Sequence, residues 1–298
     1  MRELVIVKFG GSVITTKTER KAMNRRNLDL ISNEIGVACK STDKNFIIVH
    51  GGGSYGHPLA KRFGFRYSRQ LNGDANSGVG GTIPPAKSKD ALKNFSEIKT
   101  TMEELNKNVV NSLISKDVPA VSFHPSDFCV TDNGRIVSMF TKQIDLCLNN
   151  SEIPILHGDV VKDETYGAII LSGDQILAYL AKEFKNNLSF LIVGTDVDGV
   201  FTKDPKVAPS EAHRIHVITP SLFNDLKLKF TNAQFDVTGG MRKKVETLLE
   251  LTKIGVESVI IDIKEKNVLR DLLIKGFPRD YERGTIIAMD SHAPEVGY

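Results

Sequence analysis

The sequence predicts an α/β protein, a three-layer α/β/α sandwich around a mainly parallel central sheet. Three observations lead to this fold class. Short apolar runs typical of buried strands alternate with segments whose apolar residues recur every three or four positions, as on a helix. Several of the apolar runs end in glycine-rich turns that lead toward the next helix. This strand–helix–strand order is typical of parallel sheets with right-handed crossovers.

Length and composition narrow the function classes. The 298 residues suffice for a large core in one large domain or two. A net charge of +3 without a basic tract gives no reason to expect nucleic acid as a partner. No apolar run approaches the length of a membrane span, and the chain enters a strand without a signal peptide. Three scattered cysteines without a C-x-x-C pair predict a cytoplasmic protein without disulfides or structural zinc.

The expected elements follow the chain in order. The segment 71–85 is rich in glycine and proline and is expected to be a loop, either plain or a lid over a site. Composition changes between residues 180 and 190, which divides the chain into lobes 1–185 and 186–298 of one continuous sheet rather than independent domains. Strands are expected at 4–9, 46–49, 118–121, 153–157, 167–171, 188–193, 256–263 and 285–288, a hairpin at 128–140, and helices at 24–39, 92–113, 143–148, 174–183 and from 239.

The stretch from His50 to His57, His-Gly-Gly-Gly-Ser-Tyr-Gly-His, is the motif around which the chain is organised. Its glycines let neighbouring N–H groups converge on one point, and a helix expected to begin near Pro58 adds partial positive charge. The combination favours an anion site. A tight turn whose glycines only relieve strain is the alternative, since a lone glycine triplet is a weak motif.

The same stretch also fits a second motif. Residues 52–56 spell G-x-S-x-G, the nucleophile elbow of α/β-hydrolases, with Ser54 as the nucleophile. A serine hydrolase would leave Lys8, Asp174 and the distal glycine turns without a role, and no upstream oxyanion loop is evident. We therefore rank the serine hydrolase interpretation below the anion-binding interpretation.

Further glycine turns and lysines extend the anion hypothesis. Glycine turns also follow the strands ending near residues 9, 157 and 193. The cations Arg242–Lys244 lie in the first turn of a predicted helix, where they oppose its dipole, so a bound anion would explain them. Asp174 either complements a helix dipole or holds lysine side chains in place. Phosphoryl transfer needs this combination, because phosphates must be held in line and their developing charge neutralised. The lysines near the turns are Lys8, Lys17, Lys203, Lys206 and Lys244.

These motifs resemble those of the amino acid kinase superfamily, in which they occur in the same order along nearly the whole chain. Within it the chain looks most like the isopentenyl phosphate kinase family, because of the run from Ser12 to Lys17 and the loop from His50 to His57. The matching motifs are Lys8-Phe-Gly-Gly-Ser12, the loop from His50 to His57, Ser172-Gly-Asp174, the run from Gly194 to Pro205, and Thr238-Gly-Gly-Met-Arg-Lys-Lys244.

The resemblance implies ATP-dependent, direct in-line phosphorylation of isopentenyl phosphate to isopentenyl diphosphate, in an alternative mevalonate route. It implies Mg²⁺ held mostly by phosphate oxygens, without a protein metal site, and a homodimer. The lobe 1–185 would bind the acceptor phosphate and the lobe 186–298 ATP. Alternatives are another small-molecule kinase of the superfamily, such as a fosfomycin-type phosphonate kinase, and a non-catalytic nucleotide sensor.

Residue roles follow from the resemblance as well. His57 would contact the accepting phosphate, Lys8 and Lys17 the transferring phosphate, and Asp174 would orient Lys8 and Lys244. Acceptor binding would use Gly52, Gly53, Ser54, Gly56, His57 and Gly158. ATP binding would use Lys8, Gly10, Gly11, Ser12, Thr195, Asp196, Asp198, Gly199, Val200, Phe201, Lys203, Gly240 and Lys244. The helical stripe near Phe95, Ile98 and Met102 is our candidate wall for the apolar tail, with plain core as the alternative.

Overall fold

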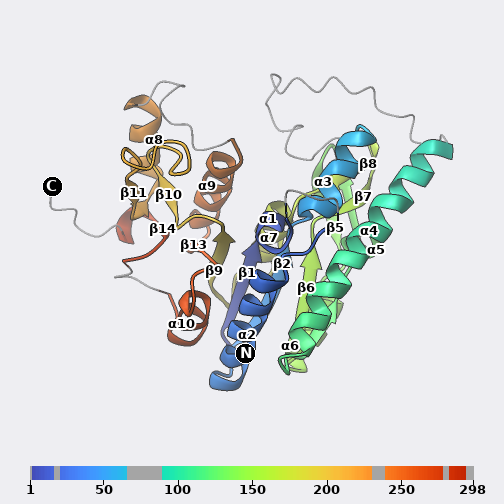
Figure 1. Cartoon of the computed structure of the whole chain (residues 1–298), viewed down its shortest axis with the longest axis horizontal. Helices are drawn as coiled ribbons and strands as arrows, with labels where there is room; N and C mark the ends of the chain where they lie inside the picture. The colour runs from blue at the N-terminus through green and yellow to red at the C-terminus, as the bar shows by residue number, and fades with distance from the viewer. Residues whose placement is uncertain (1, 17–20, 66–88, 230–238, 278–281, 293–298) are drawn as a thin grey trace.

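An eight-stranded sheet runs through the middle of the computed structural model, which describes residues 2–16, 21–65, 89–229, 239–277 and 282–292 (Figure 1). The strand order is β12-β14-β13-β9-β1-β2-β6-β3, and every neighbouring pair is parallel except β13 and β14. The strands are β1 (Leu4–Phe9), β2 (Asn45–His50), β3 (Ala120–Ser122), β6 (Ile153–His157), β9 (Leu188–Thr195), β12 (Val217–Ile218), β13 (Ser258–Asp262) and β14 (Thr285–Ile287).

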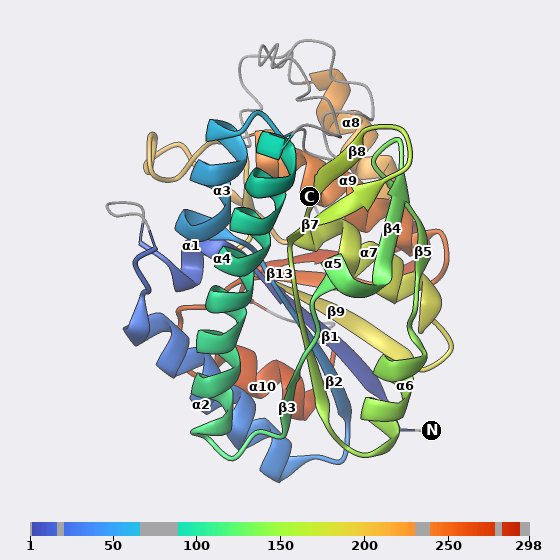
Figure 2. The same ribbon diagram turned by 90° about the vertical axis from the view of Figure 1, so that its right-hand side faces the viewer.

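Helices cover both faces of this sheet (Figure 2). One face packs against α1 (Gly11–Ile14), α2 (Arg25–Ser41), α3 (Gly53–Arg62), α4 (Lys89–Ile114) and α10 (Val268–Lys275). The other packs against α6 (Lys142–Asn149), α7 (Gly173–Glu183), α8 (Pro220–Lys229) and α9 (Gly239–Thr252). The predicted three-layer α/β/α sandwich is therefore confirmed.

The central strands are buried on both faces, as expected for a covered parallel sheet. In β1, Val5 and Val7 pack on the α2–α4 side, whereas Leu4 and Ile6 pack on the α7–α9 side. The same alternation directs Lys8, at the end of the strand, toward α7 and α9.

A second sheet of four strands, which the sequence analysis does not predict, lies beside the main one. Its order is β5-β4-β7-β8. The hairpin expected at residues 128–140 forms part of it, with Asn133 (φ 45°) and Gly134 (φ 77°) in the turn. Its strands are β4 (Cys129–Asp132), β5 (Arg135–Met139), β7 (Asp159–Asp163) and β8 (Gly167–Leu171); the short α5 (Pro125–Phe128) precedes it, and β10 (Val200–Phe201) pairs with β11 (Arg214–Ile215) elsewhere.

Several helices differ from expectation. Helix α3 begins at Gly53 rather than near Pro58, so that the second half of the loop from His50 to His57 belongs to the helix. His57 consequently projects from a helix. Helix α10 was not expected, since its eight residues lie between two apolar strands.

The described residues do not test every prediction from the sequence. The segment 71–85 and Lys17 lie outside them. The lobe boundary at residues 185 and 186 stays a prediction, although the main sheet draws strands from both sides of it. Among the described residues, none of the helices has the length and apolar character needed to cross a membrane.

Candidate active site

Four parallel strands end side by side at one edge of the main sheet. Phe9 of β1 is in register with His50 of β2 and with Gly194 of β9, and His50 is in register with His157 of β6. The carboxyl ends of parallel strands are where open α/β sheets bind ligands. The glycine turns identified in the sequence therefore converge at this edge.

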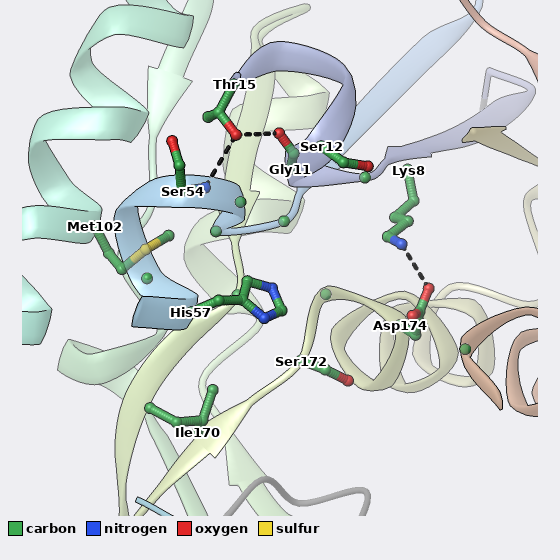
Figure 3. A pocket seen from close by; sticks show the side chains of 18 of the residues that line it. Lys8, Gly11, Ser12, Thr15, Ser54, His57, Met102, Ile170, Ser172 and Asp174 are labelled. Carbon is green, nitrogen blue, oxygen red and sulfur yellow. Dashed lines mark hydrogen bonds and ion pairs between the residues drawn. The ribbon is translucent and has the colours of Figure 1, made fainter. Parts of the chain in front are cut away.

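The first two glycine turns touch through their backbones. A Cβ added to Gly11 would lie 2.0 Å from the Gly53 nitrogen, so only glycine fits at this contact. Gly53 itself has a φ of +48°, a conformation that favours glycine. The Thr15 hydroxyl joins the two turns, because it donates to the Gly11 carbonyl (2.8 Å) and accepts from the Ser54 N–H (3.0 Å). Figure 3 shows Thr15 between the two loops.

A cavity of about 550 Å³ opens between these turns and the N-termini of α3, α7 and α9. Helix N-termini present unpaired N–H groups and partial positive charge, which suits an anion. Figure 3 shows the His57 ring projecting into the cavity, with Lys8 and Asp174 on one side and Met102 and Ile170 on the other. One end of the cavity is thus charged and the other apolar.

Lys8 and Lys244 share one carboxylate at the charged end. Their Nζ atoms lie 2.7 and 3.0 Å from Asp174 Oδ1. Burial lowers the pKa of the Lys8 ammonium, whereas the Asp174 carboxylate raises it; Lys244 lowers it further. The predicted contact of Asp174 with both lysines is confirmed. When both ammonium groups are charged, two cations and one anion leave a net positive charge for a ligand to neutralise.

Comparison with known proteins identifies the family. The model of the amino acid kinase family matches residues 3–262. The chain belongs to the amino acid kinase family. This family member is 35% identical to the isopentenyl phosphate kinase of Methanothermobacter thermautotrophicus, over 87% of its own length and 91% of the relative. It is 26% identical to that of Arabidopsis thaliana, over 95% and 94% of the two chains.

Solved structures agree with this assignment. A crystal structure of isopentenyl phosphate kinase, 32% identical, superimposes with a TM-score of 0.74 over 96% of this family member and all of that chain. The carbamate kinase of Giardia, at 14% identity and a TM-score of 0.65 over 97% and 99% of the two chains, shows the shared fold alone.

Most of the predicted site residues meet at the cavity of this amino acid kinase family member. Phe95 does not line it but packs under the Lys162 ammonium, which lies 4.0 Å from the ring centroid. Lys17 lies outside the described residues. The predicted residues that line the cavity are Lys8, Gly10, Gly11, Ser12, Gly52, Gly53, Ser54, Gly56, His57, Ile98, Met102, Gly158, Asp174, Thr195, Asp196, Gly240 and Lys244.

The segment from Asp198 to Lys203 lies beside the cavity rather than on its lining. Asp198 accepts a hydrogen bond from the Gly284 N–H (2.9 Å) and pairs with Arg214. Lys203 pairs with Glu211. These contacts hold the loop itself, and the contribution of Asp198, Gly199, Val200, Phe201 and Lys203 to ATP binding stays a prediction.

The sequence analysis missed several lining residues. Thr15 follows the Gly10-Gly11 turn but carries no motif of its own, and its role emerges only once the second turn lies beside the first. Asp159 and Ile170 come from the unpredicted sheet. Burial raises the pKa of the Asp159 carboxyl to about 6, although N–H donors from Ser126 and Val160 act against this.

The side chains that line the cavity bear on how a metal ion could be held. Among the described residues, no group of three or more His, Cys, Asp or Glu side chains could hold one. The carboxylates that line the cavity are engaged: Asp174 by two lysines, Asp159 by two backbone N–H groups, and Asp196 by Lys206. The site fits a Mg²⁺ ion that phosphate oxygens hold.

We predict that Thr15→Val lowers the free energy of unfolding by about 1–3 kcal/mol, because the part-buried Ser54 N–H loses its acceptor. Thr15→Ser keeps the oxygen and should lose clearly less. Urea unfolding of both variants measures the difference. Equal stability of Thr15→Val and the parent would show that the hydroxyl does not join the turns.

Proposed function

We propose that the protein transfers the γ-phosphoryl group of ATP to isopentenyl phosphate and forms isopentenyl diphosphate. The observation that carries this proposal is the division of one cavity around His57 into a charged end and an apolar end. A substrate with a phosphate and a short hydrocarbon tail matches both ends. The similarity to isopentenyl phosphate kinases over most of the chain supports the same reaction.

The charged end suits an in-line transfer. Lys8 and Lys244 would neutralise the transferring phosphate, and Asp174 would keep both ammonium groups in position. The N–H groups of the glycine turns would hold the flanking phosphates from either side. Mg²⁺, bound by phosphate oxygens, would offset further negative charge between the two substrates. His57 would donate to an acceptor oxygen that is not transferred.

The apolar end suits the hydrocarbon tail. Ile98 and Met102 of α4 are buried and line the cavity together with Ile170 of β8. Met102 packs tightly against the loop from His50 to His57, since a Cβ on Gly56 would lie 2.9 Å from its sulfur. Its side chain therefore bounds the cavity beside this loop.

The alternatives receive less support. The Ser54 hydroxyl oxygen is buried and has no hydrogen-bond partner within the described part of the chain, so no base is placed to activate it for hydrolysis. A sensor would not need two lysines held by one carboxylate. A homodimer, favoured because closed two-fold dimers are common, and a cytoplasmic location remain our expectations from the sequence.

An acceptor screen tests the proposed function. The purified protein is supplied with ATP and Mg²⁺ and with isopentenyl phosphate, dimethylallyl phosphate, fosfomycin or an acidic amino acid. We expect ATP consumption with isopentenyl phosphate, with the diphosphate seen by phosphorus NMR. Turnover of fosfomycin alone would favour the phosphonate kinase, and no turnover with any acceptor would favour the sensor.

We predict that Asp174→Asn and Lys8→Ala each lower turnover at least about a hundredfold, the scale for loss of one positioned electrostatic group. Asp117→Asn is the matched control, because this exposed carboxylate pairs only with Lys40 in the described contacts and lies outside the cavity. Steady-state kinetics and melting curves are measured together. Near-normal turnover of Asp174→Asn would show that Asp174 only complements the helix dipole.

His57→Ala should impair binding and use of the acceptor more than binding of ATP. The ring projects toward the cavity from α3, so its loss should raise KM for isopentenyl phosphate or lower turnover, with the affinity for ATP about unchanged. Calorimetric titration with ATP and initial rates against the acceptor separate these effects. Loss of ATP binding together with activity would contradict the assignment.

Met102→Ala should improve use of ten-carbon geranyl phosphate relative to the five-carbon acceptor. A hydrophobic pocket discriminates by roughly 1–3 kcal/mol per methylene, so the preference should shift without loss of turnover. Phe95→Ala is the control, because Phe95 lies on the same helix but off the cavity lining. The measurement is the ratio of kcat/KM for the two acceptors. An unchanged ratio in Met102→Ala would show that the hydrocarbon tail does not bind against Met102.

A further inference from the structure

A hydrogen bond that the proposed mechanism does not use joins the second sheet to the helix that carries Asp174. The turn of the β4–β5 hairpin, Asn133 and Gly134, lies beside the start of α7 (Figure 2). The Gln175 Nε2 atom lies 3.1 Å from the Gly134 oxygen. A carbonyl oxygen can only accept, so the amide nitrogen of Gln175 donates. We call this bond the hairpin contact.

A buried carboxylate holds the hairpin turn in place. Asp163, the last residue of β7, is 3% exposed. Its Oδ2 atom accepts from the Gly134 N–H (2.9 Å) and from the Thr131 hydroxyl (2.8 Å). Its Oδ1 atom accepts from the Tyr166 N–H (2.8 Å), and the Tyr166 hydroxyl donates to Asn133 Oδ1 (2.8 Å). The Gly134 carbonyl is therefore a fixed point on the second sheet.

The other end of the hairpin contact is the first turn of α7. The Ser172 side chain accepts from the Gln175 N–H (3.3 Å), and the Gln175 side chain completes the capping box. Asp174 lies between these two residues and holds the ammonium groups of Lys8 and Lys244 at 2.7 and 3.0 Å. Gln175 itself does not line the cavity, so its effect on the reaction must pass through this turn.

The first turn of α7 packs closely against the rest of the site. A Cβ added to Gly158, in the glycine turn after β6, would lie 3.2 Å from the Gly173 nitrogen. A Cβ added to Gly173 would lie 3.4 Å from the His50 carbonyl oxygen and 3.6 Å from Lys8 Cε. Any shift of this turn moves Asp174 relative to the lysines. Misplacement of a catalytic group by about 1 Å can cost about a hundredfold in rate.

The hairpin contact requires an amide at the third position of α7. A capping box forms with either glutamate or glutamine at this position, and the helix dipole favours the carboxylate. Only glutamine can donate to the Gly134 carbonyl. A glutamate would oppose one oxygen to another and add a negative charge next to Asp174.

We propose that Gln175 is a positioning residue for phosphoryl transfer, which joins α7 to the hairpin turn and keeps the Asp174 carboxylate in place between the two lysines. The inference rests on the proposed function, because it assigns Gln175 a task in the same reaction. The second sheet thereby supports the charged end of the cavity as well as the apolar end, to which it supplies Ile170. Without the contact, the first turn of α7 loses its side-chain link to that sheet.

Two substitutions of Gln175 that share only the loss of the donor test the proposal. Gln175→Glu keeps the oxygen of the capping box but adds a charge, whereas Gln175→Met adds no charge but loses that oxygen. We expect each to lower kcat about tenfold, with KM for ATP and for isopentenyl phosphate within about twofold, because the contact aligns groups that act in the transition state. Parent kcat in either variant would overturn the proposal, because the added charge alone or the lost cap alone would then explain the other variant.

Gln143→Glu is the matched control, since Gln143 is an exposed glutamine in the first turn of α6 and lies outside the cavity lining. It should keep the parent rate. Calorimetric titration with ATP counts the competent sites in each preparation, and kcat is calculated per competent site. A merely structural role of Gln175 would lower the number of sites and leave kcat per site unchanged, which would also overturn the proposal.

Asn133→Ala disturbs the same contact from the hairpin side. It removes the acceptor of the Tyr166 hydroxyl and a residue type that tolerates the left-handed conformation (φ 45°). We expect kcat to fall about threefold in the parent and to stay unchanged in Gln175→Met, since changes that act through one contact are not additive. An equal fall in both backgrounds would show that the hairpin affects the site by another route and would overturn the proposal.

Deuterium exchange separates failure of this inference from failure of the proposed function. Peptides that span the hairpin turn and the first turn of α7 should exchange at least about threefold faster in Gln175→Met than in the parent, whichever acceptor is used. Transfer by the parent with unchanged kcat in the Gln175 variants would refute this inference alone. No transfer by the parent to any acceptor would refute the proposed function, and equal exchange in the parent and Gln175→Met would then refute the contact as well.

Discussion

The close backbone approach of two glycine turns is the constraint on which the rest of the site depends. Gly11 and Gly53 leave no room for a Cβ at their contact, and the Thr15 hydroxyl bonds to both turns. The approach is possible because β1 and β2 are adjacent and end in register. Residues of both turns therefore line one cavity.

The alternation of side chains along the strands places the charged groups of the site on one face of the sheet and the side chain of His50 on the other. Lys8 points toward α7 and α9, where Asp174 pairs it with Lys244. His50, at the end of the neighbouring strand, is directed to the α4 side, where it meets Asn106. Two lysines that share one carboxylate thus lie on one face of the sheet, and the contact between His50 and Asn106 lies on the other. The glycine turns lie between these two groups.

The burial of these groups explains why they are arranged as sets. A buried lysine loses stability as a cation unless a carboxylate lies next to it, and burial favours the neutral form of an imidazole. Asp174 supplies that carboxylate for Lys8. Burial lowers the pKa of His50 to about 4 and that of His157 to about 3.

The sequence by itself determined the fold class, most strands and helices, and the glycine turns with their lysines. These features depend on local pattern: apolar period, turn residues and helix caps such as Ser172 with Gln175, which form a capping box. Only the tertiary structure decided which turns touch, that α3 begins inside the second turn, and that a second sheet brings Ile170 and Asp159 to the cavity. It also separated Met102, which lines the cavity, from Phe95, which lies on the same helix but not on the lining. Helical period places residues on a stripe, but what faces that stripe depends on strand order and register, which bring together segments far apart in the chain.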